Sequence, residues 1–341
     1  MIFEEMEFYN VAELIDDGGA GKLLTRIPND LRLSLNEAAK GHALFPAGSE
    51  IRFNLNGATV KIVLNVEGEG WGIAEVFQGP FQVNWHYLDS KPTEIVIVPP
   101  ANPELLAKAA RKSSSSFDPS LTRLILPHLN TIRLVAIEIK NGNITPPSPG
   151  QTPSRRYLAY GSSITHGSAA LRPTGTYAAR TAELLGVDLV NLGFGAGAHC
   201  ESQIADYIAG RKDWNFASLE LGINMVGGFE AEEFRKRVEY LISRIAQAHP
   251  DKWLFCMDMF AFSDDVEENV GKSEEFRKIV SAVVKKVNSP KVVHLDGRKI
   301  LTQFSGLTLD LLHPSSSGME QMAQNLSRFI AEKLRGGVQK G

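Results

Sequence analysis

Two serines and a histidine lie close together where an apolar segment of the chain ends. The stretch YGSSITHG begins at Tyr160 and contains Ser162, Ser163 and His166. A serine hydroxyl is a weak nucleophile until a base takes its proton, and histidine suits this task because its pKa lies near neutrality. The stretch therefore indicates nucleophilic chemistry at a carbonyl group. It leaves open which serine attacks and which histidine activates it.

A better candidate for the base stands far along the chain. Of the eight histidines, only His313 has an acidic residue three positions before it, Asp310. This spacing lets the carboxylate reach the imidazole within one turn, where it fixes the ring tautomer and stabilises the imidazolium ion. His166 has Ser163 at the equivalent position. We therefore expect His166, like Ser162, to line the pocket rather than to act as the base.

Donors for an oxyanion are expected at two further points. Asn224 follows a glycine turn after an apolar strand, and its side-chain amide can donate to a developing negative charge. The stretch NLGFGAGAHC, which starts at Asn191, can bring a backbone N–H close to a substrate at Gly195 or Ala196. With the Ser163 N–H, these groups complete what acyl transfer requires: a nucleophile, a base, an orienting acid and oxyanion donors.

Alternating strand-like and helix-like segments follow residue 155 and must position these groups. Apolar runs predict strands, and the amphipathic runs between them predict helices. The strands are expected at 157–160, 187–193, 216–222, 253–260 and 291–297. Such alternation predicts a parallel sheet covered by helices on both faces. In open sheets of this kind ligands bind outside the carboxyl ends of the strands, which is where the candidate residues stand.

The first 145 residues have a different pattern. Short runs rich in β-branched and aromatic residues, separated by turns, predict an antiparallel sandwich or jelly roll. Asn56-Gly57 joins two of these runs, and we expect a hairpin there because both residues tolerate positive φ. Residues 102–120 predict a short helix followed by a polar loop. A proline- and glycine-rich segment at 146–154 then predicts a linker to a catalytic domain at 155–341.

Composition argues against several classes of partner. The 341 residues are 43% hydrophobic and 22% charged, with a net charge of -3, so neither nucleic acid nor an anionic membrane is an expected partner. No apolar run approaches the roughly 20 residues of a membrane span, and the acidic N-terminus does not resemble a signal peptide. Only Cys200 and Cys256 are present, both in apolar surroundings, so we expect no disulfide and a cytoplasmic location. The oligomeric state is not indicated.

Four sequence blocks together resemble the SGNH hydrolases, the group that contains the GDSL esterases. The first family block, Gly-Asp-Ser, corresponds to Gly161-Ser162-Ser163, so Ser163 matches the nucleophile and Ser162 stands in the aspartate's place. The second block supplies a backbone donor, usually glycine, and here the matching position is Ala196. The remaining blocks are Gly-x-Asn-Asp, here GINM with Asn224 kept, and Asp-x-x-His, here Asp310 to His313.

The resemblance covers about residues 156–335 and carries several implications. It implies a flavodoxin-like three-layer α/β/α domain and hydrolysis through an acyl-enzyme. The implied triad is Ser163, His313 and Asp310, with Ser163, Asn224 and the turn containing Gly195 and Ala196 as the oxyanion hole. No metal or cofactor is implied. A β-sandwich before such a domain is similar to some carbohydrate acetylesterases, which makes a small acyl ester, and an acetylated sugar in particular, the expected substrate.

Other interpretations stay open beside this one. The same site could act on lipid or thioester substrates with longer acyl chains. The altered second block and the missing acid after Asn224 would also suit a non-catalytic carbohydrate-binding protein on a hydrolase scaffold. Trp71, Trp85 and Tyr87 could stack on sugar rings, although we expect them in a core or between domains. GFGAGA fits a dinucleotide fingerprint only loosely, since it follows the second strand of its domain rather than the first.

Overall fold

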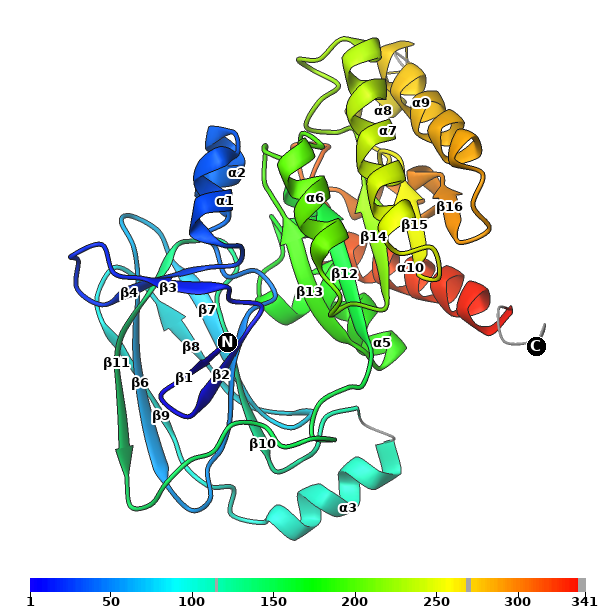
Figure 1. The fold of residues 1–341 in the computed structure, drawn as a ribbon. Coiled ribbons are helices and arrows are strands. Elements are labelled where there is room, and N and C mark those ends of the chain that lie inside the picture. Colours follow the sequence, from blue (N-terminus) through cyan, green and yellow to red (C-terminus); the bar gives the residue numbers. More distant parts are fainter. Residues whose placement is uncertain (114–115, 268–270, 337–341) are drawn as a thin grey trace.

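The structure is a computed structural model, and it describes residues 1–113, 116–267 and 271–336. Two units lie side by side, an N-terminal unit of antiparallel strands and a C-terminal unit of alternating strands and helices (Figure 1). Both expected fold types are confirmed. Part of the predicted polar loop (114–115) and the end of the predicted catalytic domain (337–341) lie outside the described residues. Among the described helices, none has the length and apolar character needed to cross a membrane.

The N-terminal unit, called the β domain below, is a sandwich of two antiparallel sheets. Sheet A has the order β1 (Ile2–Phe3), β2 (Met6–Tyr9), β5 (Glu50–Asn54), β10 (Leu121–Ile125), β7 (Gly72–Gln78) and β8 (Phe81–Leu88). Sheet B has the order β3 (Glu13–Ile15), β4 (Lys22–Thr25), β11 (Ile132–Lys140), β6 (Thr59–Val66) and β9 (Thr93–Ile97). Alternate apolar side chains, among them Ile51, Phe53 and Ile62, fill the core between the sheets.

The hairpin expected at Asn56-Gly57 is wrong, although the turn itself forms. Both residues have positive φ, 46° and 90°, and Ala58 N–H donates to Leu55 O at 2.7 Å. However, β5 belongs to sheet A and β6 to sheet B, so the turn carries the chain from one sheet to the other. A local turn signal sets the backbone conformation, but burial of both strands in the sandwich decides which neighbours they pair with.

The expected burial of three aromatic side chains is also wrong. Trp71, Trp85 and Tyr87 remain 42%, 61% and 54% exposed, Trp71 directly before β7 and the other two on the edge strand β8. Trp85 lies opposite Glu75, and Tyr87 lies opposite Ile73, in the pairing of β8 with β7. Side chains directly opposite one another share a face of the sheet. Trp85 and Tyr87 therefore occupy the outer face of sheet A rather than a core.

The C-terminal unit is built on sheet C, in which all strands are parallel. Its order is β13 (Asp188–Gly193), β12 (Arg156–Gly161), β14 (Phe216–Glu220), β15 (Trp253–Met257) and β16 (Val292–Leu295). In chain order this is 2-1-3-4-5, the order of flavodoxin-like sheets. The chain adds β13 on one side of β12 and the later strands on the other, so the strand order reverses at β12. A ligand is expected at the carboxyl end of that strand.

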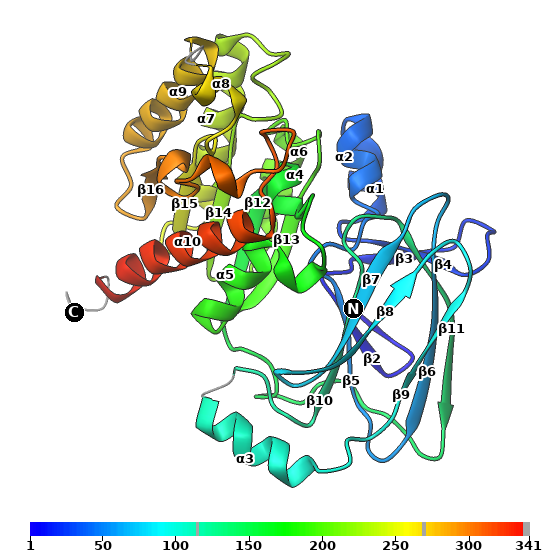
Figure 2. The ribbon, with the colours of Figure 1, turned by 180° about the vertical axis from the view of Figure 1, so that it is seen from behind.

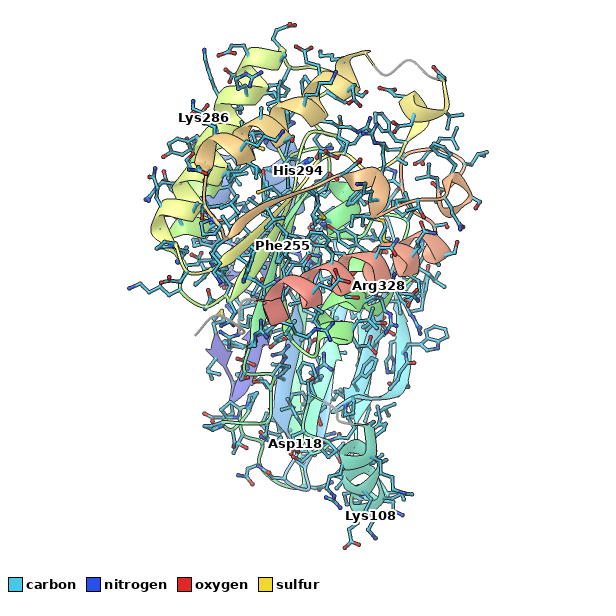
Figure 3. All side chains as sticks on the ribbon, turned by 90° about the vertical axis from the view of Figure 1, so that its right-hand side faces the viewer. Lys108, Asp118, Phe255, Lys286, His294 and Arg328 are labelled. Carbon is cyan, nitrogen blue, oxygen red and sulfur yellow. The ribbon has the colours of Figure 1, made fainter. Side chains whose placement is uncertain are left out.

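Helices cover both faces of sheet C and form two separate cores. One face is covered by α5 (Tyr177–Leu185) and α10 (Ser316–Gly336), the other by α6 (Ser202–Gly210), α7 (Ala231–Ala248) and α9 (Gly271–Val287) (Figure 2). In Figure 3 the helix that carries Arg328 crosses beside Phe255, and Phe329 of this helix packs edge-on against Phe255 at 6.1 Å. This unit also contains the short helices α4 (Ser163–His166) and α8 (Ser263–Val266), with 3-10 turns at Pro173–Gly175, Gly297–Lys299 and Phe304–Gly306, whereas α3 (Pro103–Ser113) belongs to the β domain.

Two short helices of the β domain, which sequence analysis did not predict, reach the α/β unit. They are α1 (Asn29–Ser34) and α2 (Glu37–His42), and they rise from the sandwich toward α6 (Figure 1). Asn36 begins α2 by accepting the Ala39 N–H at 3.0 Å, and it donates to Gly197 O at 2.9 Å. An asparagine cap followed by the helix formers EAAK was the sequence signal that could have revealed α2.

A buried ion pair also joins the two units. Arg52 lies on the outer face of β5 and binds Asp188, the first residue of β13, through two hydrogen bonds of 2.7 Å. The segment predicted to be a linker is itself attached to the β domain, since Asn54 donates to Pro146 O and to Gln151, both at 3.0 Å. The domain boundaries drawn from composition stay a prediction.

Candidate active site

Ser163 is the first residue of α4, directly after the end of β12. Its Oγ lies 2.8 Å from Nε2 of His313. The Ser163 N–H opens a helix, where backbone donors have no acceptor within the helix itself. The serine is therefore presented at the carboxyl edge of sheet C with a histidine ring beside its hydroxyl and a backbone donor next to it.

Asp310 holds His313 from the other side of the ring. Its Oδ2 lies 2.7 Å from Nδ1, and its Oδ1 accepts the backbone N–H of His313 at 2.9 Å. Partial burial raises the pKa of Asp310, but hydrogen bonds from His313 and neighbouring groups outweigh it and hold that pKa well below its ordinary value. The ionised carboxylate accepts Nδ1–H, so Nε2 is left as the acceptor for the Ser163 hydroxyl.

Ser162 and Glu220 build the turn that carries Ser163. The Ser162 Oγ caps α4 by accepting the Ile164 N–H at 3.1 Å. Glu220, at the end of β14, accepts the Ser162 N–H at 2.6 Å and the Thr165 hydroxyl at 3.0 Å. Burial raises the pKa of Glu220, against the effect of these hydrogen bonds. The place of Glu220 beneath the nucleophile turn depends on the pairing of β12 with β14, which no local sequence signal indicates.

The candidate oxyanion donors lie in the loops after β13 and β14. Ala196 has a left-handed backbone, with φ of 52°, as expected where the family has glycine. Among the hydrogen bonds of the described residues, none uses the N–H groups of Gly195 and Ala196. Asn224 accepts the Ala198 N–H through Oδ1 at 3.2 Å, which assigns its amide orientation and leaves Nδ2 without an acceptor in the described chain. Free donors are thus available from both loops.

Helix α2 of the β domain backs the loop after β13. A side chain at Gly195 would collide with the ring of His42, and one at Gly197 would collide with the backbone of Ala39. The close approach of α2 therefore requires glycine at both positions. His42 and Ala39 of α2 therefore lie against the site, and the sequence did not predict them there.

His166 does not line an open pocket, and neither does Ser162. Both are only 1% exposed, which corrects the expectation from their position beside Ser163. The His166 ring lies between Gly193 O, at 3.3 Å from Nδ1, and His128 O, beside Nε2. Burial, aided by the positive charge of Arg26, lowers the pKa of His166 well below its ordinary value. The ring belongs to the contact between the two domains, because His128 comes from the β domain.

Other features of the described residues lie apart from this site. A cavity of about 1000 Å³ is lined by residues of the β domain and the following segment, including Asp118, at the end of the molecule shown lowest in Figure 3. A second Asp–His pair joins Asp258 to His294 at 2.7 Å, and neither of its members contacts a serine hydroxyl in the described chain. Cys200 and Cys256 are buried and unpaired. No group of three or more His, Cys, Asp or Glu side chains in the described chain could hold a metal ion.

The model of the GDSL-like lipase/acylhydrolase family matches residues 154–331. The chain belongs to this family. The match covers sheet C, most of its helical layers and all of the candidate site residues in the α/β unit. The acylhydrolase is accordingly a carboxylic ester hydrolase, as the resemblance of its sequence blocks led us to expect.

Solved structures resemble the acylhydrolase over both of its units. The salicylyl-acyltransferase SsfX3 from a tetracycline biosynthetic pathway has a TM-score of 0.78 at 19% identity, covering 98% of this chain and 96% of its own. A family two carbohydrate esterase from Cellvibrio japonicus has a TM-score of 0.67 at 12% identity, covering 98% and 96%. One from Clostridium thermocellum, an active-site mutant, has 0.61 at 17%, covering 85% and 93%. These likenesses extend the shared fold to the β domain. No curated protein sequence matches the chain.

Replacing Asp310 by Asn is expected to lower kcat about 10- to 1000-fold, because an amide facing Nδ1 favours the tautomer with the proton on Nε2. The loss should be smaller than the roughly 10⁴-fold effect of a buried acid, since the Asp310 side chain is 48% exposed and water screens its charge. The carboxylate stays ionised above its low pKa, so the wild-type kcat should show no titration of Asp310 between about pH 6 and pH 9. Steady-state kinetics with p-nitrophenyl acetate across this pH range measures the loss of kcat and its dependence on pH. Asp258→Asn is the matched control and should keep wild-type kcat; an equal loss in the two variants would contradict the assignment.

Replacing Ala196 by Gly is expected to keep activity and to raise the free energy of unfolding by up to about 1 kcal/mol. Alanine in the left-handed region costs about 1–2 kcal/mol, and the greater freedom of glycine in the unfolded chain offsets part of that relief. Urea unfolding measures the change. Ala198→Gly, in the same loop but without positive φ, should instead lower stability. Equal destabilisation by both substitutions would show that Ala196 is not strained.

Proposed function

We propose that the protein is a serine esterase that hydrolyses small acyl esters through an acyl-enzyme on Ser163. The observation that carries this proposal is the continuous hydrogen-bonded chain from Ser163 through His313 to Asp310, with spacings of 2.8 Å and 2.7 Å. It stands at the carboxyl edge of a parallel sheet, beside loops with free donors. Nucleophile, base and orienting acid thus meet in the geometry that acyl transfer uses.

The reaction follows from the roles of these atoms. Ser163 Oγ attacks the ester carbonyl while Nε2 of His313 takes its proton, and Asp310 stabilises the imidazolium that forms. The N–H groups of Ser163 and of Ala196 or Gly195, with Nδ2 of Asn224, stabilise the oxyanion. His313 then gives its proton to the leaving alcohol. In the second half, His313 activates a water molecule, which releases the acid and restores Ser163.

A carbohydrate as the alcohol part of the substrate is the second element of the proposal. Family two carbohydrate esterases share the fold over both domains, although at 12% and 17% identity they support the fold alone. Independent support comes from Trp85 and Tyr87, exposed on the outer face of sheet A, because aromatic rings are the side chains that stack on sugar rings. Glu75, opposite Trp85, accepts the Thr174 N–H at 3.1 Å, so this face adjoins the α/β domain.

Transfer of the acyl group to an alcohol is a second candidate function. The salicylyl-acyltransferase shares the fold over nearly the whole of this chain, and transfer differs from hydrolysis only in what attacks the acyl-enzyme. A small alcohol added to the assay separates the two. Ester formed with that alcohol in preference to free acid would favour transfer, and free acid alone would favour hydrolysis.

Ser163→Ala is expected to lower kcat on p-nitrophenyl acetate by about 10³-fold or more, because no other group can form the acyl-enzyme. Ser162→Ala is the matched control: it should keep kcat within about threefold and lose about 1 kcal/mol of stability with the helix cap. Mass spectrometry should find an acetyl group on Ser163 during turnover. Full activity in Ser163→Ala would refute the proposal. Faster hydrolysis of C10 than of C2 esters would favour a lipase or thioesterase. Sugar binding without any ester turnover would favour a non-catalytic protein.

Trp85→Ala is expected to lower kcat/KM on acetylated xylan about two- to tenfold, the effect of losing an aromatic contact of about 0.5–1.5 kcal/mol. The same variant should keep wild-type kcat/KM on p-nitrophenyl acetate, which has no sugar to stack. Release of acetate measures both. Tyr240→Ala removes an aromatic ring that is 43% exposed on α7 and should change neither value. Unchanged deacetylation of xylan by Trp85→Ala would remove this support for a carbohydrate substrate.

A further inference from the structure

Arg26 is an arginine of the β domain whose guanidinium is enclosed where the two domains meet. The residue is 1% exposed. Its Nη1 donates to Asn191 O at 2.8 Å, and its Nη2 donates to Gly193 O at 2.8 Å and to His42 O at 2.7 Å. All three acceptors are backbone carbonyls, and in the described chain no carboxylate pairs with this arginine.

Two of these carbonyls belong to the free edge of sheet C. β13 is the last strand of the sheet on that side, so the backbone groups that face away from β12 have no neighbouring strand. Buried carbonyls of this kind need donors from elsewhere. Arg26 supplies them at Asn191 and Gly193, and Asn10 adds a second donor to Asn191 O at 3.2 Å. The β domain therefore completes the carboxyl end of β13.

The end of β13 is also the base on which the candidate active site stands. The Asn191 side chain donates to Thr165 O of α4 at 2.9 Å and accepts the Gly193 N–H at 2.8 Å. Phe194, the next residue along, has its ring 5.1 Å from the Arg26 guanidinium carbon. The loop with the candidate oxyanion donors follows at once. A displacement at Asn191 or Gly193 would therefore move both this loop and the helix that begins with Ser163.

The charge of Arg26 is costly in this place. Burial lowers the pKa of Arg26 to about 9, so the guanidinium is still a cation at neutral pH. Carbonyl dipoles compensate a buried charge less well than a carboxylate does. Arg52 offers the contrast, since it crosses the same interface at the other end of β13 and is paired with Asp188 and Glu50. Arg26 is therefore a more costly contact between the two domains than the ion pair of Arg52.

We propose that Arg26 is a positioning residue that holds the oxyanion loop, residues 194–198, in register with Ser163. The inference rests on the proposed esterase function and adds that the β domain is part of the catalytic machinery. Oxyanion donors act only within a narrow range of distance, and misplacement of about 1 Å can cost 100-fold in rate. Arg26 does not meet the substrate, so its loss should lower kcat and leave KM nearly unchanged.

Arg26→Met tests this with p-nitrophenyl acetate well below the unfolding temperature. The expected result is a kcat about 100-fold lower with KM within about threefold of wild type. Diethyl p-nitrophenyl phosphate phosphorylates Ser163, and its phosphoryl oxygen occupies the same oxyanion hole. The rate of this phosphorylation should fall by the same factor as kcat. Arg26→Gln, which keeps two donors on a shorter side chain, gives the second test if Arg26→Met does not fold. It should lose about tenfold in kcat.

Asp188→Asn is the matched control, because it weakens the contact between the domains at the opposite end of the same strand. It should lower the unfolding temperature and keep kcat. Wild-type kcat in a folded Arg26 variant, or an equal loss of kcat in Asp188→Asn, would overturn the role of Arg26 while leaving the esterase proposal intact. If the wild-type protein showed no turnover that depends on Ser163, both the role of Arg26 and the esterase proposal would be overturned.

Discussion

The free edge of sheet C is the constraint on which the arrangement of the two domains depends. β13 is the edge strand on one side of the sheet, and the β domain that covers it supplies donors to its outward carbonyls at Asn191 and Gly193. At the other end of the strand, Arg52 binds Asp188. One sandwich thus attaches to both ends of the edge strand, so the N-terminal domain stabilises the sheet as well as lying beside it.

In the turn that carries Ser163, the replacement of the family's aspartate by Ser162 is linked to the position of Glu220. Ser162 stands where the family block has aspartate, and its hydroxyl caps α4. The carboxylate near this turn comes instead from Glu220, which accepts the Ser162 N–H. An aspartate at 162 would place a second buried carboxylate beside the first, and like charges so close destabilise one another. A neutral hydroxyl avoids this repulsion and keeps the cap.

Local patterns in the sequence were sufficient for the strands and main helices of the α/β unit and for part of the site. The alternation of strands and helices after residue 155 predicted the parallel sheet, because hydrophobic periodicity reflects which faces are buried. The pair Asp310 and His313 was also indicated by its spacing, since three residues allow the carboxylate to reach the ring. Asn56-Gly57 shows the limit of such signals: the turn formed as expected, but its strands joined different sheets.

The fold class, the family and the order of the candidate residues could all be predicted from the sequence, because each depends on short-range pattern or on motifs in a set order. Only the tertiary structure brought His313 to Ser163, enclosed His166 between the domains and placed Glu220 beneath the nucleophile turn. It alone also joined Arg26 and α2 to the loop after β13. These contacts link segments that are far apart along the chain, and they arise from how two domains cover one sheet edge, which no local pattern encodes.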